Sequence, residues 1–215
     1  MTLKKKDFIE IEFTAKTDDG KVFDSNVKEE LEKLHAGHDH PVDAKPFVFS
    51  LSQGMFLLGV EDFLIGKEIG KYHIRLTPEK AFGPRRVELV QRMPIKLFAE
   101  NNLNPVPGIM FNFDGRIGKV LAVTGGRVMV DFNNPIAGKN VEYDVKILRK
   151  VDNLEEKVKA LIDFLFRQDL KFEIKDKKLI IEVEKSMKSF VDMFKDKFKE
   201  ILDLDLEVKG IEDKQ

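Results

Sequence analysis

The sequence predicts an α+β protein built from an antiparallel sheet around a short helix, an inserted small all-β domain, and a C-terminal domain of order α-β-β-α-β. Three observations predict this class. Several segments of the first 151 residues alternate apolar and polar side chains, two glycine-containing hairpin signals lie between residues 84 and 134, and the remaining residues change to helical spacing. We therefore expect three domains, over residues 1–83 with 135–151, residues 84–134, and residues 152–215.

The first domain is predicted from strands whose side chains point alternately to two faces. After Phe8, apolar residues at every second position through Ala15 alternate with charged or polar residues, and Asp19-Gly20 then supplies a turn. The short apolar run at 60–65, bounded by glycines, fits one or two helical turns laid across such a sheet. The other predicted strands contain Phe47, Phe49 and Leu51; Tyr72, Ile74 and Leu76; and Val141, Tyr143, Val145 and Ile147.

The segment from 84 to 134 has its own start and stop signals. Asp114-Gly115 and Gly125-Gly126 are typical of tight hairpin turns. Both ends of the segment join nearby points of the first sheet, as expected of a domain inserted at a loop tip. The predicted strands cover residues 87–91, 108–113, 117–124 and 127–132.

Residues 152–215 carry two amphipathic helical patterns with three short strands between and after them. Two helices on a three-stranded sheet leave sheet edges and apolar helix surface uncovered. We expect a second copy of the chain to cover that surface, as a homodimer through residues 152–215. A peptide-binding module and a purely stabilising module are the alternatives. The predicted helices cover about 154–165 and 187–198, and the strands about 170–175, 178–184 and 204–208.

The composition excludes several functional classes. The 37 basic and 38 acidic residues give a formal net charge of −1, which provides no global attraction to nucleic acid or anionic membranes. The basic start is not followed by an apolar segment, and no stretch approaches the roughly 20 apolar residues of a membrane span. We expect a cytoplasmic protein without nucleic-acid or membrane partners. The absence of cysteine excludes disulfides, thiolate catalysis and cysteine zinc sites.

Four motifs follow one another in a specific order. They are Asp-Gly-Lys-Val-Phe-Asp-Ser at 19–25, Gly-Met-Phe-Leu-Leu-Gly-Val-Glu at 54–61, Pro-Glu-Lys-Ala-Phe-Gly at 78–83 and, after the insertion, residues 134–145. Over about residues 4–151 the chain resembles an FKBP-type prolyl isomerase, and its long insertion resembles the SlyD-like branch of that family. The resemblance implies isomerisation of X-Pro bonds, protein folding assistance, and capture of unfolded chains on the inserted domain.

The resemblance also implies an isomerase cleft that requires no cofactor. A dry apolar cleft with oriented charge and hydrogen bonds favours the twisted amide, without a nucleophile or a general base. The Asp24 carboxylate would bias the amide electrostatically, Leu57 would point its N–H at the substrate carbonyl, and Val60 would form the floor. Phe56 would stand at the rim, and Ile136 would contact substrate as a lid. The aromatic walls of the family correspond to Phe13, Phe23, Phe47, Phe82 and Tyr143.

Three positions depart from the family pattern. Val60 stands where drug-binding relatives usually have tryptophan, and Phe13 and Phe82 stand where tyrosine is usual, so two hydroxyl hydrogen bonds are missing. A non-catalytic holdase chaperone that kept the fold is therefore the alternative from another functional class. For one phenylalanine alone, a core position is the simpler interpretation, whereas the ordered motifs together favour the enzyme.

The inserted segment contains more apolar side chains than a surface needs, including methionine, which suits adaptable contacts. More than half of them are expected to form the core of the domain itself. We expect the remainder to form a groove or an unpaired strand edge for unfolded or proline-containing polypeptides. The predicted contact residues are Leu89, Val90, Met93, Leu97 and Phe98.

Three histidines, His35, His38 and His40, lie within six residues, beside Asp39 and Asp43. Imidazoles in such a cluster are able to ligate a divalent metal such as zinc or nickel, so metal handling is a third functional hypothesis. A solvated loop is the competing interpretation.

Overall fold

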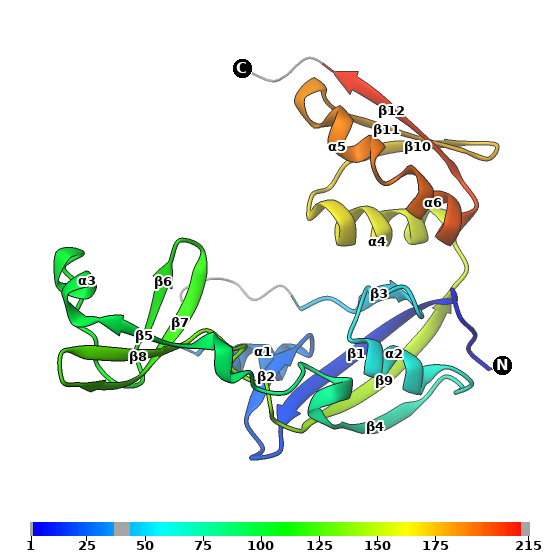
Figure 1. Cartoon of the computed structure of the whole chain (residues 1–215). Coiled ribbons are helices and arrows are strands. Elements are labelled where there is room, and N and C mark those ends of the chain that lie inside the picture. Colours follow the sequence, from blue (N-terminus) through cyan, green and yellow to red (C-terminus); the bar gives the residue numbers. More distant parts are fainter. Residues whose placement is uncertain (1, 37–43, 212–215) are drawn as a thin grey trace. The chain divides into compact units, whose positions relative to one another are not determined.

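The computed structural model describes residues 2–36 and 44–211 of the chain. Contacts between Cα atoms divide the chain into a first unit, Met1–Arg75 with Glu142–Gln215, and a second unit, Leu76–Val141 (Figure 1). Residues 152–215 belong to the first unit, so the domain boundary predicted at residue 152 is not a boundary between these units.

The sheet of the first unit consists of β1 (Phe8–Thr17), β2 (Val22–Ser25), β3 (Phe47–Ser50), β4 (Lys71–Leu76) and β9 (Val141–Val151). The strand order is β2-β1-β9-β4, and β3 also pairs with β1 (Figure 1). Both partners are antiparallel to β1: β3 pairs with Phe8–Ile11, and β2 pairs with Thr14–Lys16. The last residues of β2 and the first residues of β3 therefore meet β1 close to Phe13.

The alternation predicted for β1 is confirmed by burial, since Ile9, Ile11 and Ala15 are fully buried. The predicted short helix is also confirmed, as α2 (Leu58–Leu64). It turns Val60 and Leu64 into the core, where both are fully buried. This burial of one helix face holds α2 and the loop before it in a fixed position.

The second unit contains a four-stranded sheet of β5 (Val90–Pro94), β6 (Met110–Phe113), β7 (Arg116–Thr124) and β8 (Arg127–Asp131). Its order is β5-β8-β7-β6, so β5 and β6 are the two edges. The prediction of an all-β insertion is wrong, because α3 (Ile95–Glu100) directly follows β5. Leucine, lysine, alanine and glutamate in this segment are good helix formers. The predicted strand at 87–91 begins only at Val90, after the 3₁₀ turn η2 (Val87–Leu89).

The core of the second unit is small and closely packed. Phe98 of α3 is buried in it together with Val120, Val128 and Val130. Gly118 is required by this packing, because a Cβ at that position would lie 2.6 Å from a methyl group of Val130. The partly buried residues around this core are Met93, Leu103, Phe111, Phe113, Val123 and Phe132.

The two chain segments that lead into and out of the β5–β8 sheet are hydrogen-bonded to each other. The Gly138 N–H donates to the Gly83 carbonyl at 2.9 Å. The Arg86 N–H donates to Asn133 Oδ1 at 2.8 Å, and the Asn133 amide donates back to the Arg86 carbonyl at 2.9 Å. The chain thus leaves the β5–β8 region beside the point at which it enters.

The C-terminal elements are α4 (Leu154–Phe166), β10 (Lys171–Lys175), β11 (Lys178–Glu184), the 3₁₀ turn η3 (Lys185–Met187), α5 (Lys188–Asp192), α6 (Lys195–Leu202) and β12 (Asp205–Ile211). They follow the predicted order, but the second predicted helix is divided into α5 and α6. Phe194 leaves helical geometry at this break, and its ring packs at 5.3 Å against Phe166 of α4. None of the helices in the described ranges is both long and apolar enough to cross a membrane.

Several apolar side chains of this C-terminal part are exposed, and Phe190 and Met193 are the most exposed of them. Phe190 is 47% exposed and Met193 is 77% exposed. The predicted homodimer would cover such side chains, and it stays a prediction.

Candidate active site

Five aromatic side chains assigned to the cleft from the sequence meet in the first unit. They are Phe13 of β1, Phe23 of β2, Phe47 of β3, Phe56 of the loop before α2, and Tyr143 of β9. The Phe56 centroid lies 4.9 Å from that of Phe13, 5.7 Å from that of Phe47 and 5.8 Å from that of Tyr143. Phe23 joins through Tyr143, at 6.1 Å. Phe56, expected at the rim, is half-buried at the centre of this aromatic cluster.

A cleft of about 340 Å³ opens beside the aromatic cluster. Its apolar walls come from β1, from β3 and from the loop before α2, and its polar groups come from the end of β2, from Lys45 and from residues 163 and 167. Tyr143 is 2% exposed and supports the walls from behind. The lining residues from these elements include Phe13, Asp24, Ser25, Phe47, Met55 and Phe56.

The Asp24 carboxylate is incompletely hydrated. The residue as a whole is exposed, but partial burial of the carboxyl raises the pKa of Asp24 above its usual 3.8, and a hydrogen bond from the Ser25 backbone offsets part of this rise. Burial also raises the pKa of the Tyr143 hydroxyl, and the charge of Asp24 adds to that rise. A carboxylate among apolar walls exerts a stronger electrostatic effect than one in water.

Two polar side chains after Asp24 hold the end of β2 against β1. The Ser25 hydroxyl donates to the Phe13 carbonyl at 2.9 Å. The Asn26 side chain accepts from the Phe13 N–H at 2.7 Å and donates to the Ile11 carbonyl at 2.9 Å. These bonds add to the backbone bond from the Asn26 N–H to the Phe13 carbonyl, and they hold the two residues that follow Asp24 against β1. No local pattern in the sequence predicts this role, because the bonds join residues 12 to 15 positions apart.

The loop that carries Phe56 is held by the buried carboxylate of Glu61. One oxygen of Glu61 accepts from the Phe56 N–H at 2.7 Å, and the other accepts from the N–H groups of Gln53 and Gly54 at 3.0 and 3.3 Å. Glu61 is 0% exposed. Charge-assisted bonds of this kind are about twice as strong as neutral ones. Glu61 therefore positions the central ring of the aromatic cluster, a role that the sequence analysis did not assign.

Leu57 and Val60 follow this loop directly in the chain, at the start of α2. Leu57 immediately precedes α2, and its carbonyl accepts from the N–H groups of Val60 and Glu61. Leu57 is the N-cap residue of α2, so its N–H has no carbonyl partner within the helix. Val60 is fully buried, as a floor residue would be. The contacts of both residues with a substrate stay predictions.

Two predicted site residues belong to the second unit. Phe82 follows the 3₁₀ turn η1 (Pro78–Lys80), and Ile136 lies in the turn that begins at Asn134. Both are half-buried. Their assignment to the cleft stays a prediction.

The predicted chain-binding residues are divided between surface and core. Leu97 is 43% exposed, and Leu89, Val90 and Met93 are half-buried. Phe98 is a correction: it is 1% exposed at the centre of the core of the second unit, because the helix that was not predicted turns its ring inward. Phe98 is therefore a structural residue.

The histidine cluster falls largely outside the described residues. His38 and His40 lie in the segment 37–43, for which the structure gives no description. His35 follows α1 (Lys28–Leu34) as its C-cap residue. Within residues 2–36 and 44–211, no group of three potential ligands is close enough to hold a metal ion. The metal hypothesis stays a prediction.

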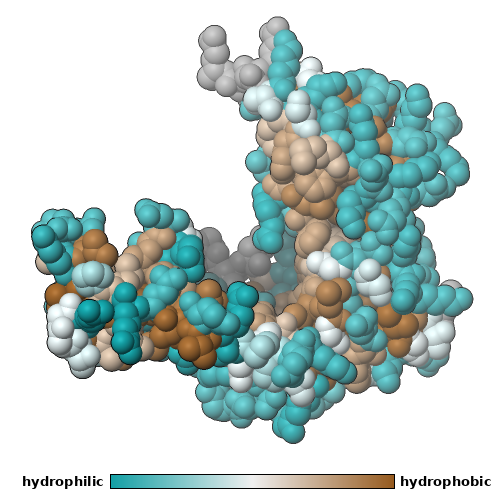
Figure 2. Space-filling model, in the orientation of Figure 1, coloured by the Kyte–Doolittle hydropathy of each residue, from teal (hydrophilic) through white to brown (hydrophobic). Residues whose placement is uncertain are grey.

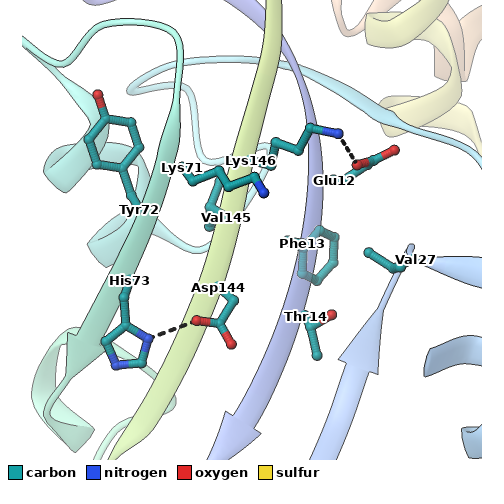
Figure 3. Close-up of a pocket in the computed structure, with 10 residues that line it drawn as sticks. All are labelled: Glu12, Phe13, Thr14, Val27, Lys71, Tyr72, His73, Asp144, Val145 and Lys146. Carbon is teal, nitrogen blue, oxygen red and sulfur yellow. Dashed lines mark hydrogen bonds and ion pairs between the residues drawn. The ribbon is translucent and has the colours of Figure 1, made fainter. Parts of the chain in front are cut away.

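A larger hollow on the first unit, about 440 Å³, lies on the polar face of the sheet (Figure 3). His73 contacts Asp144 there at 2.8 Å, and Lys146 donates to Glu12 at 3.0 Å. Ion pairs on an open face offer no dry surface for a proline ring. The smaller cleft, whose walls include Phe13, Phe47 and Phe56, is therefore the better candidate for the predicted site.

Comparisons with known proteins identify the family of the chain. The family model of the FKBP-type peptidyl-prolyl cis-trans isomerase matches residues 1–95, and a model of the IF domain of FKBP26 matches residues 91–136. The chain is 30% identical over 146 residues to the short-type peptidyl-prolyl cis-trans isomerase of Methanocaldococcus jannaschii, an alignment that covers 67% of this chain and 92% of the relative.

Two further relatives are bacterial. A probable FKBP-type 16 kDa peptidyl-prolyl cis-trans isomerase of Pseudomonas fluorescens is 33% identical over 114 residues, which cover 51% of this chain and 76% of the relative. The FKBP-type isomerase SlyD of Escherichia coli is 27% identical over 173 residues, covering 74% of this chain and 75% of the relative. The chain belongs to the family of FKBP-type peptidyl-prolyl cis-trans isomerases.

Proposed function

We propose that this protein accelerates folding by isomerising X-Pro bonds in unfolded or proline-containing polypeptides. The observation that supports this most is the cleft in which Phe13, Phe47 and Phe56 stand beside the incompletely hydrated carboxylate of Asp24. An aromatic wall accepts the apolar proline ring, and the carboxylate supplies an oriented charge near the amide.

The proposed mechanism acts on amide resonance. Rotation about a peptide bond has a barrier of about 18–20 kcal/mol, because the planar amide has partial double-bond character. The aromatic walls hold the proline and exclude water from the amide, which disfavours the polarised planar form relative to the twisted one. The Leu57 N–H binds the substrate carbonyl, and Asp24 acts through its charge without transferring a proton.

Substitution of Asp24 tests this function. We expect Asp24→Ala to lower kcat/KM for the cis-to-trans conversion of a short Phe-Pro peptide by about tenfold or more, the order of effect that follows loss of one oriented electrostatic group. Asp18→Ala is the matched control, since Asp18 is an exposed carboxylate in the turn after β1. Equal losses in both variants would contradict the role of Asp24. A folded wild type that gives no acceleration would leave the non-catalytic holdase as the better function.

The pH dependence gives a second prediction for Asp24. Since its pKa is raised, the catalytic charge should be lost on acidification at a pH above its usual 3.8. The rate with wild type should therefore rise with pH through this pKa, whereas Asp24→Asn should be slow and independent of pH. The isomerisation rate of the peptide, measured from acidic to neutral pH, tests this prediction. If the isomerisation rate of Asp24→Asn fell at acidic pH in the same way as that of wild type, the titrating group would not be Asp24.

The effect of the raised pKa of Asp24 on stability has the opposite sign. A raised folded-state pKa stabilises the fold at pH values below the unfolded-state pKa, and this contribution is lost as the pH rises through the folded-state pKa.

We also propose that the second unit holds the unfolded chain while the cleft acts on it. Apolar side chains are visible on the surface of this unit in Figure 2. The strand β5 lies at an edge of its sheet, where an extended chain is able to add a strand, and an exposed apolar patch supplies contacts that tolerate many sequences. Its exposed large apolar residues include Leu97, Val106, Ile109, Met110, Ile117 and Leu121.

A further inference from the structure

We propose that Phe164 of α4 is a substrate-contacting wall of the isomerase cleft and selects for an apolar residue next to proline, an inference that rests on the function proposed above. The last turn of α4 lines the same cleft as Phe13, Phe47 and Phe56. Both parts of the chain lie in the first unit. The resemblance to isomerases did not cover α4, so the family motifs assign no site residue there.

The position of α4 is fixed by contacts near its start. The Arg149 guanidinium of β9 binds Glu10 of β1 and Glu156 of α4 at the same time. The Lys157 ammonium lies 5.8 Å from the centroid of the Phe8 ring. A single exposed ion pair stabilises little, but a shared guanidinium between two strands and a helix restricts the orientation of the helix. From Glu156 to Phe164 the helix advances about 12 Å, at 1.5 Å per residue.

The two ends of α4 are well defined. The Asn153 side chain accepts from the Glu156 N–H at 3.0 Å and caps the first turn. Arg167 takes left-handed backbone geometry, with φ of 54°, and its N–H donates to the Asp163 carbonyl at 2.9 Å. The helix therefore stops at Phe166, and its last turn is held at the edge of the cleft.

Phe164 and Phe166 have different surroundings. Phe166 is 6% exposed and packs with Phe190, Phe194 and Phe198 of the C-terminal elements. Successive helix residues are turned by about 100°, so the side chain two positions earlier leaves the helix on nearly the opposite side. Phe164 is accordingly half-buried and lines the cleft, with Asp163 and Arg167 as the polar residues beside it.

An aromatic side chain at this position adds apolar surface to a cleft whose other rings bind proline. The charged residues that line the cleft are two acidic, Asp24 and Asp163, and two basic, Lys45 and Arg167, so together they favour neither sign of substrate. The apolar contact therefore decides the preference, and the best substrates should carry a large apolar residue beside proline.

The experiment compares Phe164→Ala with wild type in two assays, peptide turnover and direct peptide binding by fluorescence anisotropy. We expect kcat/KM for a Phe-Pro peptide to fall about five- to tenfold and its Kd to rise by a similar factor, with a change below about twofold for a Gly-Pro peptide. Phe164→Leu should restore most of the loss. Met193→Ala is the control for trimming an apolar side chain of the C-terminal part outside the cleft, and Tm is measured for each variant.

Several results would overturn the inference. They are an unchanged Phe-Pro preference in Phe164→Ala, an equal loss for both peptides, and faster turnover, which would mean that α4 obstructs the cleft.

Failure of the proposed function would give a different pattern in the two assays. If wild type bound the peptides without turnover, catalysis would be refuted, while the binding assay would still decide the role of Phe164. A wild type that neither binds nor converts either peptide would refute both.

Discussion

Glu61→Ala is expected to lower the free energy of unfolding by roughly 3–6 kcal/mol and to remove most isomerase activity. The carboxylate accepts three backbone N–H groups from the loop at 53–56 and is fully buried. An alanine would leave these donors without acceptors, and each unsatisfied buried donor costs about 1–3 kcal/mol. The loop would then no longer hold Phe56 at the centre of the aromatic cluster. Urea unfolding and peptide turnover, measured on the same preparation, give the two readouts.

Two variants separate this loop effect from a general loss of an acidic residue. Glu61→Gln keeps one acceptor oxygen, so we expect an intermediate loss of stability. Asp62→Ala removes the neighbouring carboxylate of α2, which is exposed, and should change the free energy of unfolding by less than about 0.5 kcal/mol. A Glu61→Ala protein of wild-type stability and activity would refute the positioning role of Glu61.

Replacing residues 84–134 by a short glycine turn is expected to separate the two proposed activities. The hydrogen bond from the Gly138 N–H to the Gly83 carbonyl shows that the flanking chain ends are adjacent, so a short connection is able to close the gap. Turnover of a short Phe-Pro peptide should stay within about threefold of wild type. Acceleration of a proline-limited refolding reaction should fall by about 10²-fold, because the second binding site raises the local concentration of X-Pro bonds.

A point variant tests the same surface in the full chain. Leu97→Ser should weaken refolding acceleration without affecting peptide turnover, since Leu97 is exposed on α3. Phe98→Ala, one residue further, should instead unfold the second unit, because that ring is the centre of its core.

The truncation also tests the position of the cleft. If the protein without residues 84–134 remained folded but lost peptide turnover, the catalytic cleft would have been placed wrongly.

Much of the fold was predictable because burial imposes simple periods on the sequence. The period of two predicted β1, β3, β4 and β9, and helical spacing predicted α4. The insertion was harder to predict, since a six-residue helix such as α3 spans fewer than two turns and has almost no period of its own. Without a period to separate core from surface, Phe98 is predicted among the surplus apolar residues of the surface.

The aromatic cluster was predictable only through the resemblance of ordered motifs. Any single phenylalanine at an alternating position is compatible with an ordinary core, and Phe49, which lies 5.3 Å from Phe56, is fully buried in that way. The supporting bonds of Ser25, Asn26 and Glu61 were not predicted. Each joins a side chain to backbone groups of another segment, and no sequence period records such a contact.

The sequence by itself determined the class of the fold, the identity of the motifs and the aromatic residues that form the cluster, because these depend on local spacing and order along the chain. Only the tertiary structure decided that Phe56 is central, that Glu61 holds its loop, and that Phe164 reaches the cleft from α4. These contacts join residues distant in sequence or depend on the direction of a side chain, which packing fixes and local preference does not.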